Sequence, residues 1–266
     1  MNVTGTSAGS KSNTTGAISS TETGAGATSN TATLTVVAPP TISKAFGVAS
    51  IPLNGSTSVT LTLANPNTGT GLSGVAVSDT FPAGLQVAAT PSLSNTCGGT
   101  VTGATAASTS ISLSGGSIAL NSSCAVSVNV TPTTSGSKLN TTGNVSSTNG
   151  GTGNSASATL GAGDFTISVS PTSQTIPPGH MAVYTLTLSS TTGFTGTIGL
   201  TCSGGPPSST CTIVPSSVTP TSGSETAKVT VDLAVPKGAS KGTPTLTFTG
   251  TSGTLTHSTT ATLKVK

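Results

Sequence analysis

Apolar side chains alternate with Ser and Thr along many short segments, and this period of two constrains the fold more than any other feature. In residues 56–67 (STSVTLTLANPN), Val59, Leu61 and Leu63 share one face and hydroxyl side chains share the other. Successive side chains of a strand point to opposite faces of its sheet, so this pattern predicts a half-buried strand. Gly and Pro separate such segments, as turn residues do. The chain is therefore expected to be all-β.

The same alternation predicts strands along most of the chain. In residues 110–120 (SISLSGGSIAL) the Gly-Gly pair predicts a turn within the segment. Pro171 is expected to end the strand that carries Phe165, Ile167 and Val169. Further strands are predicted in residues 72–85, 124–130, 181–190, 195–202, 211–217, 227–233, 243–250 and 257–265. Short strands at this spacing predict tandem immunoglobulin-like β-sandwiches, and a closed barrel is the competing topology that periodicity fits equally well.

An internal repeat predicts the domain organisation. Residues 2–24 and residues 129–151 are identical at 15 of 23 positions without a gap. In the second copy this stretch ends a longer module, so the chain is expected to begin inside an equivalent module. The predicted organisation is the C-terminal strands of an incomplete Ig-like repeat at 1–38, a complete repeat at 39–162 and a second type of Ig-like β-sandwich at 163–266.

Composition excludes several classes of protein. Charged residues make up 5% of the chain, the net charge is +3 and the mean hydropathy is +0.19, whereas disordered chains combine low hydrophobicity with high net charge. All eight basic residues are scattered lysines, so no arginine fork is present and no nucleic-acid partner is expected. No apolar stretch is long enough to span a membrane. The first residues lack the basic and apolar regions of a secretion signal, so an exported protein would need its export segment from elsewhere.

The four cysteines fall into two close pairs, Cys97 with Cys124 and Cys202 with Cys211. No CxxC spacing is present, and even pairing within separate modules predicts two disulfides and an oxidising compartment. Reduced buried thiols are the alternative.

Several motifs that occur in order resemble a known family. PPTISKAF (39–46), LANPN (63–67), VSDTFPAGL (77–85) and LNTTGNVSSTNGGTG (139–153), with the first cysteine pair, resemble the conserved repeat of bacterial surface proteins known as domain of unknown function eleven. The region from Asp164 onward is similar to Ig-like modules that end secreted acidobacterial proteins. These resemblances imply extracellular spacer, adhesive or wall-associated roles and no catalysis.

The sequence offers few groups for catalysis. The acids lie too far apart to predict a catalytic pair, so isolated surface acids and solvated histidines are expected. HExxH does not occur, oxygen donors for calcium do not cluster, and Tyr184 belongs to a core-facing segment, so no enzyme, cofactor or metal site is predicted. The titratable groups concerned are Glu22, Asp79, Asp164, Glu225, Asp232, His180 and His257.

One covalent reaction is compatible with the sequence. Lys44 lies in the first predicted strand of the complete repeat, Asp79 in the middle and Asn140 in a late strand. First and last strands of such a sandwich can be neighbours, so a Lys–Asn isopeptide bond assisted by a buried acid is one hypothesis; Asn13 is the repeat equivalent of Asn140. The alternative is that Lys44 is solvated, Asp79 caps a turn and Asn140 bonds locally.

The expected function is that of a non-enzymatic, secreted structural protein, a subunit or segment of a cell-surface fibre assembled through β-strand contacts. Its expected partners are other copies of itself or neighbouring repeats. The alternative is a spacer or accessory region of a larger secreted enzyme or adhesin. Surface glycans are a further expectation, on Ser and Thr hydroxyls or at sequons that include those of Asn2, Asn13, Asn54, Asn121, Asn140 and Asn144.

Overall fold

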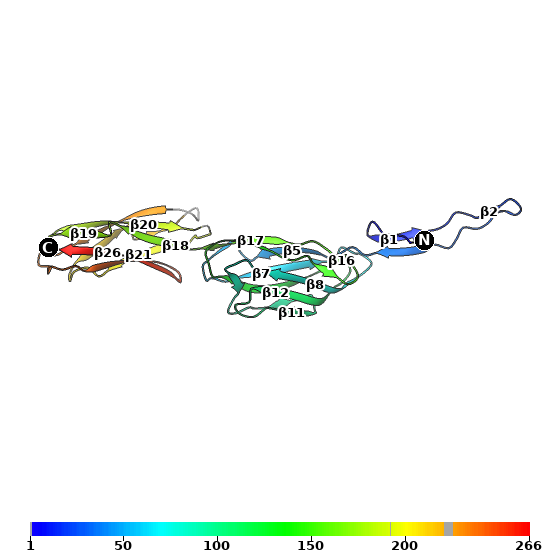
Figure 1. Ribbon diagram of the computed structural model, residues 1–266, viewed down its shortest axis with the longest axis horizontal. Helices are drawn as coiled ribbons and strands as arrows, with labels where there is room; N and C mark the ends of the chain where they lie inside the picture. The colour runs from blue at the N-terminus through cyan, green and yellow to red at the C-terminus, as the bar shows by residue number, and fades with distance from the viewer. Residues whose placement is uncertain (1, 192, 221–225) are drawn as a thin grey trace.

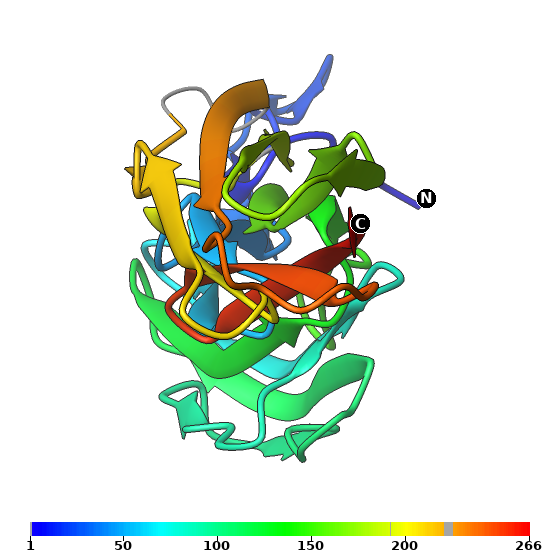
Figure 2. The ribbon, with the colours of Figure 1, turned by 90° about the vertical axis from the view of Figure 1, so that its left-hand side faces the viewer.

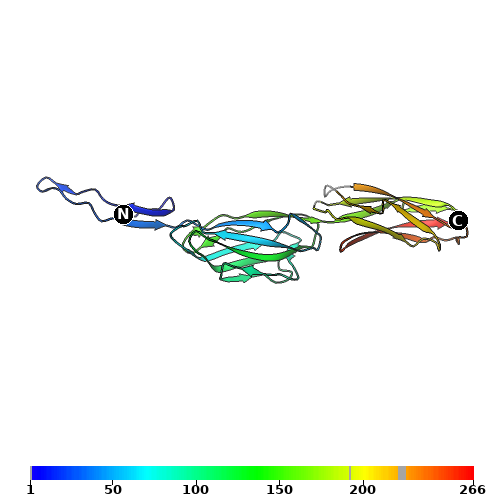
Figure 3. The same cartoon turned by 180° about the vertical axis from the view of Figure 1, so that it is seen from behind.

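The computed structural model describes residues 2–191, 193–220 and 226–266 as three parts in a row (Figure 1). The N-terminus lies in an extended hairpin, residues from about 40 to 163 form the middle module, and the C-terminal module follows. The view from behind shows the same order (Figure 3). Every regular element in the described residues is a strand, which confirms the all-β prediction.

The N-terminal hairpin consists of paired strands without a second layer. Strand β1 (Gly9–Asn13) pairs antiparallel with β4 (Ala32–Val36), and β2 (Ser19–Ser20) pairs with β3 (Gly24–Ala25) beyond them. Almost every residue of this hairpin is exposed.

The middle module packs its strands around one hydrophobic core. One sheet has the order β10-β13-β7-β5, with β9 also paired to β13; its strands are β5 (Thr41–Phe46), β7 (Thr57–Ala64), β9 (Leu85–Val87), β10 (Ser94–Asn95) and β13 (Ser123–Pro132). The second has the order β11-β12-β8-β15-β16; its strands are β8 (Leu72–Thr80), β11 (Thr100–Thr102), β12 (Ser110–Ile118), β15 (Ser146–Ser147) and β16 (Gly151–Thr152). The third has the order β14-β17-β6, in which β6 (Ser50–Pro52) runs parallel to β17 (Ser157–Gly163) and β14 (Gly136–Thr141) pairs antiparallel with it.

The alternating segments supply the core of this module. Val59, Leu61 and Leu63 of β7 are at most 1% exposed, and they face inward opposite alternate residues of β13. Burial of such apolar side chains is the main favourable term in folding.

The Gly-Gly pair in residues 110–120 does not form the predicted turn. Strand β12 runs continuously through it, and its register against β8 shifts between Leu113 and Gly116. Gly115 has φ 69°, a conformation that glycine adopts without steric cost. The pair therefore makes a β-bulge, because the paired partner strand β8 continues on the far side of the glycines.

The C-terminal module is a sandwich of two sheets. One has the order β18-β20-β24-β22, with β18 (Phe165–Ser170), β20 (Met181–Ser190), β22 (Thr210–Val214) and β24 (Thr226–Ala234). The other has the order β19-β26-β25-β21-β23, with β19 (Ser173–Ile176), β21 (Ile198–Ser203), β23 (Ser217–Val218), β25 (Thr245–Ser252) and β26 (Leu255–Val265). The end-on view looks along the row from this module (Figure 2). The two sheets pack face to face, so the barrel alternative is wrong for this region.

A single residue separates the two modules along the chain. Strand β17 ends at Gly163 and β18 begins at Phe165, with Asp164 between them. The Leu53 amide donates to the Gly163 carbonyl at 2.7 Å, and the Leu53 side chain packs against the C-terminal core. A Cβ atom on Gly163 would lie 2.4 Å from the backbone of Phe194, so only glycine fits this junction.

Candidate functional site: a buried Lys–Asp–Asn cluster

Lys44, Asp79 and Asn140 meet inside the middle module, and we call them the buried triad. They come from β5, β8 and β14, one strand from each of the three sheets. Asp79 is 0% exposed and Asn140 is 1% exposed. The Lys44 side chain is also 0% exposed, so the alternative in which Lys44 is solvated and Asp79 caps a turn is wrong.

The period of two directs each member of the triad inward. In β5, Lys44 lies on the same face as Ile42 and Phe46. In β8, Asp79 lies on the same face as Val75 and Val77. A polar residue at a position of the apolar face is the sequence signal for such a site.

The late strand β14 has the opposite distribution of polarity. Lys138 and Asn140 point inward and are buried, whereas Leu139 between them is 62% exposed. This exchange of polar and apolar positions is a second sequence signal for the inward face of β14, in addition to Asn140 itself.

One carboxylate oxygen holds the triad together. The Lys44 Nζ lies 2.6 Å from Asp79 Oδ2, and both side chains are 0% exposed. The Asn140 Nδ2 donates to the same Oδ2 at 3.1 Å. The amine and the amide are thus each one hydrogen bond away from a shared acceptor.

Two oxygens of the triad lack a hydrogen-bond partner within the described residues. They are Asp79 Oδ1 and Asn140 Oδ1, and both are buried. An unsatisfied buried polar group costs about 1–3 kcal/mol. As a purely structural ion pair the triad is therefore energetically costly, because one oxygen of Asp79 and the oxygen of Asn140 accept no hydrogen bond within the described residues.

Burial lowers the pKa of Lys44 from its usual 10.5, and the hydrogen bond and charge of Asp79 oppose this shift without reversing it. Desolvation penalises the ammonium form, so the neutral amine is more accessible here than for a surface lysine. A neutral amine beside an amide carbonyl and a carboxyl group that can carry a proton can perform acyl substitution on the amide.

Two other predictions for titratable groups are corrected by the structure. Asp164 and His257 are not isolated, because Asp164 Oδ1 lies 2.8 Å from His257 Nε2 at the junction of the modules. The His257 ring also contacts Phe165 edge-on, with centroids 4.8 Å apart. His180 bonds the carbonyl of Pro178 in an exposed turn, and Glu225 lies outside the described residues.

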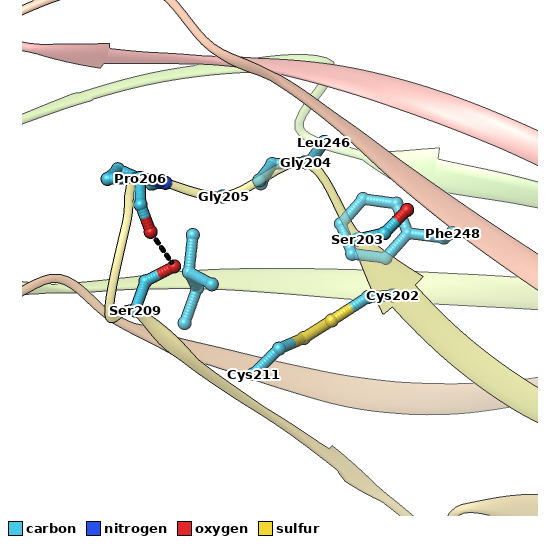
Figure 4. Close-up of a pocket in the computed structure, with 10 residues that line it drawn as sticks. Cys202, Ser203, Gly204, Gly205, Pro206, Ser209, Cys211, Leu246 and Phe248 are labelled. Carbon is cyan, nitrogen blue, oxygen red and sulfur yellow. Dashed lines mark hydrogen bonds between the residues drawn. A yellow bond between two sulfur atoms is a disulfide. The ribbon is translucent and has the colours of Figure 1, made fainter.

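Both cysteine pairs are bonded in the structure. Cys97 and Cys124 join with a Cα–Cα distance of 4.9 Å, and Cys202 and Cys211 with 6.6 Å. The second disulfide borders a hollow of about 230 Å³ (Figure 4). Ser209 donates to the Pro206 carbonyl at 2.7 Å there, and the lining residues include no acid, histidine or lysine. This hollow therefore offers no acid–base chemistry.

Across residues 2–191, 193–220 and 226–266, no three His, Cys, Asp or Glu side chains gather in a way that could hold a metal ion. The same ranges contain no helix that is long and apolar enough to cross a membrane. Asn140 is buried, so its sequon is not accessible to a glycan in the folded module.

The middle module matches a known family model. Residues 40–162, less than half of the chain, match the family model described as Domain of unknown function (DUF7933). This description differs from the domain of unknown function eleven that the motifs resemble, and that resemblance stays a prediction. No curated protein matches the chain.

The solved structures that match the chain include parts of an S-layer protein, a pilin subunit and Intimin. Domains 4 and 5 of the S-layer protein SbsC are 24% identical, over 51% of this chain and 68% of theirs, with a TM-score of 0.28. BcpA, the major pilin subunit of Bacillus cereus, is 12% identical over 80% of this chain and 59% of its own, with a TM-score of 0.40. The D0-D1 domain of Intimin is 13% identical over 85% and 97%, with a TM-score of 0.27. At these identities and TM-scores the likeness carries no argument about this chain.

Proposed function

We propose that this protein is a non-enzymatic extracellular structural protein that forms part of a cell-surface fibre and associates with other copies through β-strand contacts. The proposal includes the division into an incomplete repeat at 1–38, a complete repeat at 39–162 and a second type of module at 163–266.

The observation that carries the proposal is that the β1–β4 hairpin has the same strand pairing as β14 and β17 of the middle module but is not covered by a second layer. Strand β1 aligns with β14, and Asn13 pairs with Ala32 as Asn140 pairs with Ala158. Leu34 opposes Lys11 in the same way as Leu160 opposes Lys138.

The two equivalent leucines differ in burial. Leu160 is 0% exposed in the middle module, whereas Leu34 is 45% exposed in the hairpin. Val3 and Ile18 of the N-terminal part are 69% and 77% exposed. An exposed strand edge with apolar side chains favours pairing with another chain. Because few charges lie on the surface, little repulsion opposes such contact.

A head-to-tail contact between the hairpin of one copy and a sheet edge of the next is heterologous, and it gives filaments when the rotation does not close. The purified chain is therefore expected to form elongated assemblies in electron microscopy and large species in sedimentation velocity. A chain that lacks residues 1–38, and the variant Leu34→Glu, are expected to sediment as monomers.

The matched control is Leu139→Glu, which adds the same charge at another exposed leucine, in the complete module. It should assemble like the parent chain. Monodisperse parent particles at all accessible concentrations would contradict the proposal.

A second candidate function is a spacer or accessory region of a larger secreted enzyme or adhesin. The single-residue junction at Asp164 and the end-to-end row of modules favour it (Figure 1). A parent chain that remains an extended monomer in small-angle scattering would support this second function.

A further inference from the structure

We propose that the Lys44 and Asn140 side chains react spontaneously to form an isopeptide bond inside the middle module, with Asp79 carrying the proton. This inference does not rest on the proposed function, since a cross-linked module can serve in a fibre or in a spacer.

The reacting groups are already adjacent. Lys44 Nζ and Asn140 Nδ2 both bond Asp79 Oδ2, at 2.6 Å and 3.1 Å, so side-chain rotation alone can bring Nζ to the Asn140 Cγ. The strands β5, β8 and β14 belong to three hydrogen-bonded sheets, which hold the three residues in position. Such fixed proximity is a large part of the acceleration of intramolecular reactions.

The attacking amine has to be neutral. The short contact between Lys44 Nζ and Asp79 Oδ2 offers a direct path for a proton from the ammonium to the carboxylate. Both side chains are 0% exposed, so the neutral pair avoids the cost of burying two charges. The lowered pKa of Lys44 favours the same direction.

Asp79 Oδ1 and Asn140 Oδ1, which lack a hydrogen-bond partner within the described residues, take part in this reaction. Rotation of the Asn140 amide about its Cβ–Cγ bond turns Oδ1 toward Asp79, and the protonated carboxyl group then donates to it. This hydrogen bond polarises the carbonyl and stabilises the negative charge that develops on Oδ1 during attack. The buried acceptors that are otherwise unsatisfied within the described residues are thereby used.

The step balances without an oxidant or a co-reactant. The Nζ–Cγ bond forms, and Asp79 accepts a proton from Nζ and delivers one to Nδ2. The Cγ–Nδ2 bond then breaks, and the leaving group is one molecule of ammonia. The product is a secondary amide between Lys44 and Asn140.

The other buried lysine of the middle module lacks the partner that this chemistry needs. Lys138 is also buried, at 7% exposure on β14, but its Nζ donates to Thr134 Oγ1 at 2.6 Å and to the carbonyls of Ala83 and Ser135. No carboxylate is among these partners, so within the described residues Lys138 Nζ has no hydrogen-bonded carboxylate that could take its proton. Lys138 therefore supplies a matched control.

The test is the intact mass of the reduced, recombinant full-length chain. The mass is expected to be lower than the sequence mass by one ammonia, and tandem mass spectrometry of proteolytic fragments should show a branched peptide that links Lys44 to Asn140. Lys44→Met, Asn140→Ala and Asp79→Ala should each have the full mass of their sequences, whereas Lys138→Met should keep the loss.

Three results would overturn the inference. They are a parent chain with the full mass, an ammonia loss that maps to a linear peptide, and a loss that persists in Lys44→Met. Since the branched peptide is read from the parent chain, the test does not depend on the folding of any variant. Filament formation is measured separately, so failure of the fibre proposal leaves this result intact.

Discussion

Tyr184 lies in the core of the C-terminal module, where its hydroxyl has no hydrogen-bond partner within the described residues. The ring is 0% exposed and contacts Phe248 with centroids 5.5 Å apart. The packing of the ring therefore stabilises the core, while the buried hydroxyl opposes it.

Tyr184→Phe is expected to raise the free energy of unfolding by about 1 kcal/mol, because it removes the unsatisfied hydroxyl and keeps the ring. Urea denaturation followed by circular dichroism measures this change. As a control, Phe248→Leu removes no polar atom and should lower the free energy of unfolding by about 1–2 kcal/mol through lost packing. A Tyr184→Phe variant that is less stable than the parent would indicate a partner for the hydroxyl.

The same residue predicts a pH effect. Burial raises the pKa of Tyr184 above its usual 10.0. The phenol therefore ionises first in the unfolded chain, and its contribution to stability is lost as the pH rises past the unfolded value. The stability difference between Tyr184→Phe and the parent should accordingly widen between about pH 8 and about pH 10.5. An unchanged difference would contradict this reading.

At the scale of the elements, the bulged strand β12 packs closely against Gly98 and Gly99, the two glycines that precede β11. Gly98 and Gly99 precede β11 with φ 65° and 66°, values that strain any residue with a Cβ. A Cβ on Gly99 would lie 2.3 Å from the Ser114 carbonyl oxygen, whereas a Cβ on Gly98 would meet nothing within 4 Å. The close approach of Gly99 to β12 is thus a packing constraint in addition to a conformational one.

These two glycines form a matched pair for mutation. Gly98→Ala is expected to lower the free energy of unfolding by about 1–2 kcal/mol through backbone strain alone. Gly99→Ala adds a clash with backbone and should cost roughly 3 kcal/mol or more. Thermal or chemical denaturation compares the two variants. Equal losses in the free energy of unfolding would show that β12 can shift away from the added Cβ without an energetic penalty.

For the whole molecule, the isopeptide bond would determine how force passes along the row. Closure between Lys44 and Asn140 places residues 44–140 in a ring, and the disulfide of Cys97 with Cys124 lies inside it. Tension applied at the chain ends then bypasses most of the middle module. A strand pair that is held covalently cannot be pulled apart, which suits a protein under tensile load.

Single-molecule pulling tests this consequence. The middle module of the parent should release a length that is shorter by about 230 Å than the length released by Lys44→Met. The ring withholds segments 44–97 and 124–140, which lie outside the disulfide loop, and an extended residue spans about 3.3–3.6 Å. Lys138→Met should behave like the parent. Equal steps in the parent and Lys44→Met would show that residues 44–140 carry the load and that no ring is closed.

The fold class and the inward positions of most strands follow from the order of the residues along the chain. The alternation of Val59, Leu61 and Leu63 is a local property, and a pleated strand converts it directly into a buried face. It also placed Lys44, Asp79 and Asn140 in the first, middle and late strands of one module, which was enough to formulate the isopeptide hypothesis.

The contacts of these residues depend instead on how the strands pack in three dimensions. Whether Lys44 is solvated or buried depends on how three sheets close over it, and a period of two cannot specify contacts between sheets. The Gly115–Gly116 pair is a second case, since the same dipeptide permits a turn or a bulge and the continuing partner strand β8 selects the bulge. The pairing of Asp164 with His257 joins residues 93 positions apart, and such a contact follows from packing at the module junction alone.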